Sequence, residues 1–69
     1  MFDYDWEYEF PSIDKKLLTK NQRDVIYLRY SMVLSFGDIA KETGRTKSGV
    51  IRSHGQAAKI LGPYFLEEL

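Results

Sequence analysis

Four side chains between positions 47 and 52, three hydrogen-bond donors and one apolar group, recur at spacings of three and four residues. The four side chains are Lys47, Ser48, Ile51 and Arg52. On a helix these positions share one face, and donor groups beside an apolar surface match what the edges of DNA bases present in the major groove. The pattern therefore predicts a base-reading surface; contact with another protein and simple solvation are the alternatives for the same face.

A second set of residues suits contacts to the DNA backbone. Residues 15–66 hold ten basic side chains against three acidic ones, a net charge of +7, although the whole chain has a formal net charge of zero. Phosphate contacts position a protein on DNA without specifying sequence, and helix N-termini favour bound phosphates. The candidates lie in or close to the starts of predicted helices: Lys20, Arg23, Arg45 and Thr46.

The composition gives no support for an enzyme, a metal site or a bound cofactor. There is no cysteine, and His54 is the single histidine, with no second ligand spaced to share a metal ion with it. No nucleophile with an adjacent base and no phosphate-binding loop stands out. We expect His54 to be packed and hydrogen-bonded. The absence of cysteine suits a reducing compartment, so we expect a cytoplasmic protein. No run of 18 apolar residues exists, so no membrane partner is expected.

The first long helix is marked by its N-terminal residues. Thr19 and Gln22 have the spacing of a capping box, in which each side chain satisfies a backbone N–H group of the other residue. The helix that they open is predicted to run to about Met32. Val25, Leu28 and Met32 recur at helical spacing and are expected to form its buried face.

Two more helices are expected after it. Ser35 is a favourable N-cap for a short helix, and Gly44 is expected to end that helix in the left-handed conformation. Thr46 caps a third helix, which Gly62 and Pro63 are expected to end. Before all three, a short helical turn capped by Ser12 is expected.

The spacing of Ala40, Gly44 and Val50 is typical of a helix-turn-helix. The alanine allows the two helices to cross closely, the glycine makes the turn, and the valine locks the second helix to the first. The predicted fold class is all-α, a three- to four-helix bundle with a helix-turn-helix. This domain is expected to cover residues 12–69, preceded by an extended acidic and aromatic arm over residues 1–11.

Aromatic and acidic residues alternate along this arm. The aromatic residues, which are predicted to dock on a protein, are Phe2, Tyr4, Trp6, Tyr8 and Phe10. A period of two is typical of a strand, so an extended arm is expected. Three outcomes stay open: disorder until a partner binds, pairing with a sheet edge or with a second copy in a homodimer, or folding back with the carboxylates near Lys47 and Arg52.

A longer pattern runs from Leu18 to Leu61. Its residues are Leu18, Thr19, Gln22, Arg23, Val25, Ile26, Leu28, Arg29, Tyr30, Leu34, Ser35, Phe36, Asp38, Ile39, Ala40, Gly44, Thr46, Val50 and Ala57. With these residues the segment resembles region 4 of bacterial sigma factors. The chain differs from the usual pattern at Arg45, Ile51 and His54, where the family commonly has an apolar residue, a charged residue and a leucine. The resemblance implies a four-helix fold whose last long helix enters the major groove, and docking on RNA polymerase. Related domains occur in small phage transcription factors.

Two functions are compatible with these features. The first is a DNA-binding transcription regulator, or a sigma-like accessory factor, that binds double-stranded DNA and acts with RNA polymerase. The second is a protein-interaction domain with a degenerate helix-turn-helix. It would bind RNA polymerase, a sigma factor or another regulator without reading DNA. The basic body favours the first function, whereas Ile51 and two glycines, Gly49 and Gly55, in the predicted third helix favour the second.

Overall fold

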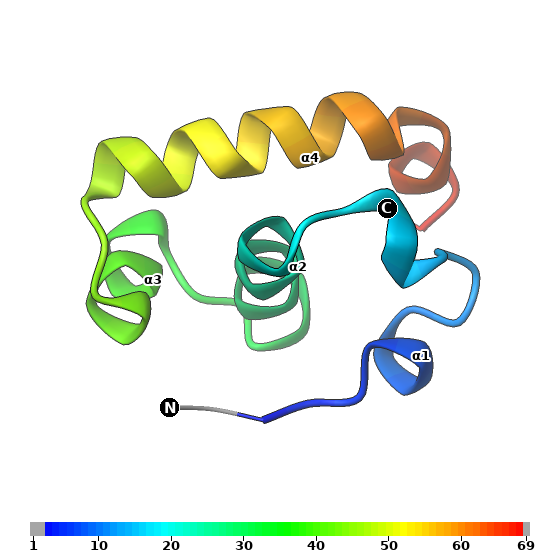
Figure 1. The fold of residues 1–69 in the computed structure, drawn as a ribbon, viewed down its shortest axis with the longest axis horizontal. Coiled ribbons are helices and arrows are strands. Elements are labelled where there is room, and N and C mark those ends of the chain that lie inside the picture. The colour runs from blue at the N-terminus through cyan, green and yellow to red at the C-terminus, as the bar shows by residue number, and fades with distance from the viewer. Residues whose placement is uncertain (1–2, 69) are drawn as a thin grey trace.

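The all-helical prediction is confirmed, and no strand occurs among residues 3–68. The computed structural model describes residues 3–68, with side chains described for residues 3–62. Figure 1 shows α4 along one side of the molecule, across α3 and α2, with α1 on the opposite side of α2. The helices in chain order are α1 (Trp6–Glu9), α2 (Lys20–Ile26), α3 (Phe36–Thr43) and α4 (Lys47–Glu68).

The capping box at the start of α2 is confirmed. The Thr19 hydroxyl accepts a hydrogen bond from the Gln22 backbone N–H group at 3.2 Å, and the Gln22 side chain accepts one from the Thr19 N–H group at 3.0 Å. The helix continues as a π-helical turn over Tyr27–Ser31. Met32 is exposed, so its predicted burial is wrong. A π turn closes on the fifth residue rather than the fourth, and this rotates Met32 away from the face that Val25 and Leu28 share.

The chain reverses direction after this π turn at Val33. The Leu34 N–H group donates to the Leu28 carbonyl at 3.0 Å, a bond that spans one residue more than in a Schellman helix end. Val33 has a φ of 57°, in the left-handed region where glycine is usual. A branched residue is strained there, and its exposed side chain gains no packing energy in return. The sharp reversal directs the chain into α3.

Two buried clusters hold the helices together, and α4 contributes to both. The first cluster consists of Trp6, Ile13, Leu18, Ile26, Ala57 and Leu61. The second consists of Val25, Leu28, Ile39, Ala40 and Val50. Because Val50 lies in one cluster and Ala57 and Leu61 in the other, α4 is fixed at two points along its length. The outward face of α4 is therefore held in a defined orientation.

The prediction of an extended arm is wrong for residues 6–9, which form α1. Asp5 caps this turn by accepting hydrogen bonds from the N–H groups of Glu7 and Tyr8. Trp6 is only 5% exposed, and its indole nitrogen donates to the Ile13 carbonyl at 2.8 Å. The Phe10 ring packs on it, with centroids 4.4 Å apart. Trp6 and Phe10 are four residues apart, a spacing that fits one turn of a helix as well as the period of a strand. Burial of the indole favours the helical turn, because a lone strand would lack hydrogen-bond partners for its backbone.

Of the outcomes considered for the arm, folding back onto the body is the one observed. Tyr4 stacks on Tyr27 with ring centroids 4.1 Å apart and an interplanar angle of 8°. Tyr8 is 79% exposed, and Phe2 lies outside the described residues. The carboxylates were expected near Lys47 and Arg52. Instead, Glu7 forms an ion pair with Lys15 at 3.5 Å, because α1 packs on the side of the molecule away from the start of α4.

Two helix boundaries also differ from expectation. The short turn before α2 covers Lys15–Leu17, and it is capped by Asp14 rather than Ser12. A carboxylate directly before the turn reaches the Lys16 N–H group at 2.9 Å. At the other end, α4 continues through Gly62 and Pro63 to Glu68. Proline removes one helical hydrogen bond but does not always end a helix, and Figure 1 shows the ribbon changing direction near this end.

Candidate nucleic-acid interface

The turn between α3 and α4 is built by local hydrogen bonds. Gly44 has a φ of 69°, as its predicted role requires, and the next N–H group, that of Arg45, donates to the Ala40 carbonyl at 3.0 Å. The Thr46 hydroxyl accepts from the Gly49 N–H group at 3.1 Å, which confirms it as the cap of α4. A Cβ atom on Gly49 would lie 3.1 Å from this hydroxyl oxygen. Glycine at this position therefore has a structural reason.

Val50 anchors the start of α4 to the helices beneath it. Its side chain is fully buried, in one cluster with Ile39 and Ala40 of α3 and with Val25 and Leu28. Close packing of this kind leaves few orientations for a helix. The residues on the opposite side of α4 are consequently presented on a rigid element, which is what a surface that recognises a defined shape requires.

The four predicted base-reading residues lie together on the outward side of α4. All four are exposed. At about 100° per residue they span about 140° of the helix circumference. Lys47 and Arg52 form no hydrogen bond or ion pair with any residue whose side chain is described. Their charged groups thus remain available, and the first turns of α4 offer ammonium, guanidinium, hydroxyl and methyl groups on one surface.

The predicted phosphate contacts do not form one surface. Arg23 donates to the carbonyls of Lys15 and Leu18, at 2.8 and 2.7 Å, so its guanidinium group holds the chain that precedes α2. Lys20 is exposed but forms an ion pair with Asp24 at 3.3 Å. These contacts give Arg23 a structural role within the chain, whereas the exposed ammonium group of Lys20 stays accessible to a second ligand.

The other two candidates flank the turn before α4. Arg45 donates a hydrogen bond to the Asn21 side chain, which joins this turn to the start of α2. Its second terminal nitrogen, Nη1, is buried and has no hydrogen-bond partner among the described residues. Thr46 uses its hydroxyl to cap α4. Arg45 therefore brings positive charge to the side of the turn, close to Lys47.

Sequence reasoning missed a polar cluster that fastens the arm to α2. Asp24 is buried and accepts hydrogen bonds from the Tyr4 hydroxyl at 2.6 Å and from Lys20 at 3.3 Å. Burial raises the pKa of Tyr4, and its hydrogen bond to Asp24 raises that pKa further. The tyrosine stays protonated and keeps donating. Tyr4 and Asp24 are 20 residues apart, so no local pattern indicates the contact.

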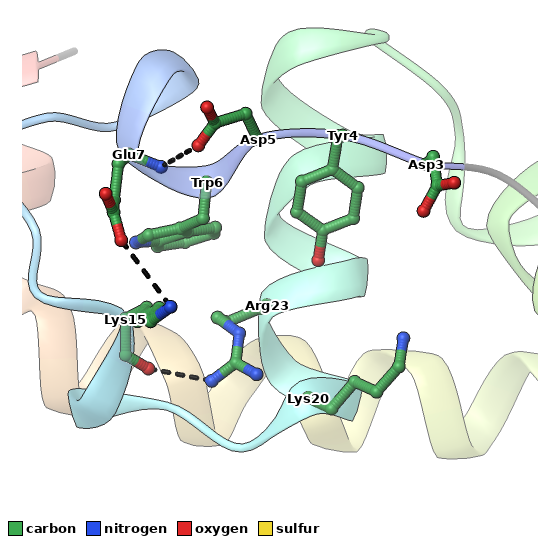
Figure 2. Close-up of a pocket in the computed structure, with 8 residues that line it drawn as sticks. All are labelled: Asp3, Tyr4, Asp5, Trp6, Glu7, Lys15, Lys20 and Arg23. Atoms are coloured by element: carbon green, nitrogen blue, oxygen red, sulfur yellow. Dashed lines mark hydrogen bonds and ion pairs between the residues drawn. The ribbon is translucent and has the colours of Figure 1, made fainter.

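A groove of about 370 Å³ lies beside this cluster, between the arm and α2. Figure 2 shows acidic side chains of the arm on one wall and basic side chains on the other, with Glu7 paired to Lys15 across them. The lining residues are Asp3, Tyr4, Asp5, Trp6, Glu7, Lys15, Lys20 and Arg23. The groove is lined by three acidic and three basic side chains, so its net charge favours neither an anion nor a cation.

His54 is packed and hydrogen-bonded, as predicted. Its Nε2 atom lies 2.7 Å from the Tyr30 hydroxyl, and its ring contacts Phe36 edge-on at 5.0 Å. Arg29 in turn covers the Phe36 ring, 4.9 Å from its centroid. The partners of His54 come from the π turn and from α3. Among the described residues, no three histidine or acidic side chains are grouped to hold a metal ion.

Acidification is expected to destabilise the protein through His54. Burial lowers the pKa of His54, and the positive charge of Arg29 lowers it further. The unfolded chain takes up this proton near the ordinary value of about 6.5. Stability that is fully present above that pH is therefore lost as the pH falls below it towards the folded-state pKa. Thermal melts between pH 7 and pH 5 should show a steeper decline in the parent chain than in His54→Gln; equal slopes would contradict this account.

No protein-family model, curated protein or solved structure matches the chain. Within the described residues, no helix combines the length and apolar character needed to span a membrane.

Proposed function

We propose that the protein is a DNA-binding transcription regulator, or a sigma-like accessory factor, that acts with RNA polymerase. In this proposal α3, the turn through Gly44 and α4 form a helix-turn-helix, and the exposed face of α4 enters the major groove. One observation carries the proposal: Lys47 and Arg52 project from a rigidly packed helix start and have no partner among the described residues. Such groups supply both attraction to phosphates and hydrogen bonds to bases.

The distribution of charge around α4 supports the same proposal. From Thr43 to Leu66 the sequence contains four basic residues and no acidic residue. Glu7 of the arm pairs with Lys15, on the side of the molecule away from the start of α4 (Figure 1). A duplex approaching the start of α4 therefore meets no carboxylate of this helix segment. The role with RNA polymerase rests on the resemblance of residues 18–61 to sigma region 4.

Base contacts and phosphate contacts are expected to respond differently to substitution. Arg52→Ala should lose about 1–3 kcal/mol of discrimination between a selected site and a scrambled one, because an arginine–guanine pair specifies sequence. Lys20→Ala should weaken binding to both duplexes alike and reduce the salt dependence, because a phosphate contact carries no sequence information. Competition titrations of the two duplexes at several salt concentrations measure both effects.

Lys16→Ala is the matched control, since Lys16 is exposed and lies outside the proposed surface. It removes the same charge as Lys20→Ala and should change affinity less. A thermal melt of Lys20→Ala is needed because the substitution also removes the ion pair to buried Asp24. Equal losses on both duplexes for Arg52→Ala would exclude it from base reading.

A protein-interaction domain is the second candidate, and exposed apolar residues favour it. Met32 and Val33 project from the reversal before α3, and Ile60 is exposed on the second half of α4. Binding to RNA polymerase, a sigma factor or another regulator through such residues needs no DNA contact. The two candidates differ in one observable: phosphate-driven binding to random duplex DNA is strong at low salt and falls steeply as salt rises. No binding at about 50 mM salt would favour the second candidate.

A further inference from the structure

Ile51 is an apolar side chain with no role in the core. It is 46% exposed, whereas the preceding residue, Val50, is fully buried. Its neighbours on the outward face are polar or small: Lys47 and Ser48 precede it by one turn, and Gly55 follows by one turn. Core packing explains Val50, but it does not explain a branched apolar residue at position 51.

Gly55 lies at the centre of the same face, and no contact within the chain explains why a glycine occupies this position. Glycine inside a helix is unfavourable relative to alanine. A Cβ atom at Gly55 would meet nothing within 4 Å, in contrast to Gly49, where it would meet the cap of α4. The absence of a side chain at the centre of this face allows a large flat ligand to approach the helix backbone closely. Close approach would bring Ile51 to the surface of that ligand.

We infer that Ile51 contacts the 5-methyl group of a thymine in the major groove, next to the base that Arg52 reads, and this inference rests on the proposed function. Among the four DNA bases, the thymine methyl is the apolar group that the major groove presents. The exposed isoleucine, the adjacent guanidinium group and the open backbone at Gly55 together match a thymine beside a guanine. Ile51 then determines specificity at one position of the DNA site.

Replacement of thymine by deoxyuridine tests this contact, because it removes the methyl group and keeps the base pair. The duplex is one selected from a random library by the parent chain, and each thymine is replaced in turn. At one position we expect about four-fold weaker binding by the parent, the effect of one buried methyl group. Ile51→Ala should bind the thymine duplex more weakly and no longer distinguish thymine from deoxyuridine at that position.

Ile60→Ala is the matched control, because Ile60 is 45% exposed on the same helix but lies outside the proposed surface. It should keep the preference for thymine. Gly55→Ala should melt at a higher temperature than the parent chain and bind the selected duplex several-fold more weakly. Unchanged affinity of Gly55→Ala would contradict the close approach of DNA to α4.

The outcomes separate this inference from the function on which it rests. Binding to a selected duplex with no effect of any deoxyuridine would overturn the thymine contact and leave DNA binding intact. A thymine preference that persists in Ile51→Ala would assign the contact to another residue and overturn the inference equally. Failure to bind any duplex at about 50 mM salt would overturn the proposed function itself.

Discussion

Val50→Asp is expected to unfold the domain. Val50 is fully buried in the cluster that joins α4 to α3 and α2, and an unpaired carboxylate at that position loses its hydration without gaining a partner. The cost is several kcal/mol, which is comparable to the whole stability of a small domain, roughly 5–15 kcal/mol. Circular dichroism at 25 °C, followed by a thermal melt, measures the loss of helix.

Ile51→Asp is the control for this substitution. It introduces the same charge at the next residue, on the exposed side of α4, where water solvates the carboxylate. The control should remain helical and should melt close to the parent chain, since surface substitutions usually change stability by about 0.5 kcal/mol or less. A Val50→Asp chain as helical and as heat-stable as the Ile51→Asp chain would contradict the packing of α4 described above.

Trp6→Ala is expected to destabilise the protein by about 3–5 kcal/mol, the range for removing a large buried aromatic side chain. Trp6 lies in one cluster with Ile13, Leu18 and Leu61. The substitution also leaves the Ile13 carbonyl without its indole donor. Urea denaturation of both chains gives the difference in the free energy of unfolding.

Tyr8→Ala provides the comparison within the same four-residue helix. Tyr8 is 79% exposed, so its removal should have little effect on the urea midpoint. The contrast between the two variants distinguishes an arm that completes the core from a solvated tail. If Trp6→Ala unfolds at the same urea concentration as Tyr8→Ala, α1 is not part of the folded domain.

Local chemistry explains which parts of the fold could be predicted. The capping box of Thr19 and Gln22, the Ser35 cap and the left-handed Gly44 depend on residues at most four positions apart. Their conformations follow from the residues themselves, and all three were predicted correctly. Two other local signals were misleading: helix α4 continues through Pro63, although proline commonly marks a boundary, and Asp14 rather than Ser12 caps the turn before α2.

The conformation of the arm could not be predicted from its alternating pattern. Trp6 and Phe10 fit a strand by their even spacing, but they are also four residues apart and therefore neighbours on a helix. The helix is favoured by burial among residues that are distant in sequence, since Trp6 shares one core cluster with Ile26, Ala57 and Leu61. A pattern of neighbouring residues cannot predict this burial, because the residues that bury Trp6 lie elsewhere in the sequence.

In the candidate site, too, local features could be predicted from the sequence and contacts between distant residues could not. The shared outward face of Lys47, Ser48, Ile51 and Arg52 follows from helical periodicity, and the sequence is sufficient to predict it. The sequence does not indicate that Arg23 is held by two carbonyl groups or that His54 bonds to Tyr30, 24 residues away. Such pairings depend on how the helices cross.

The most direct test of the central claim, that DNA binds to the first turns of α4, is a titration of the isotope-labelled chain with a short duplex, followed by NMR. At about 50 mM salt, the backbone amide resonances of residues 45–55 should shift, together with that of Lys20, and the shifts should diminish as salt is raised. The resonance of Tyr8 should stay in place. Shifts confined to the arm, or no shifts at any duplex concentration, would contradict the claim.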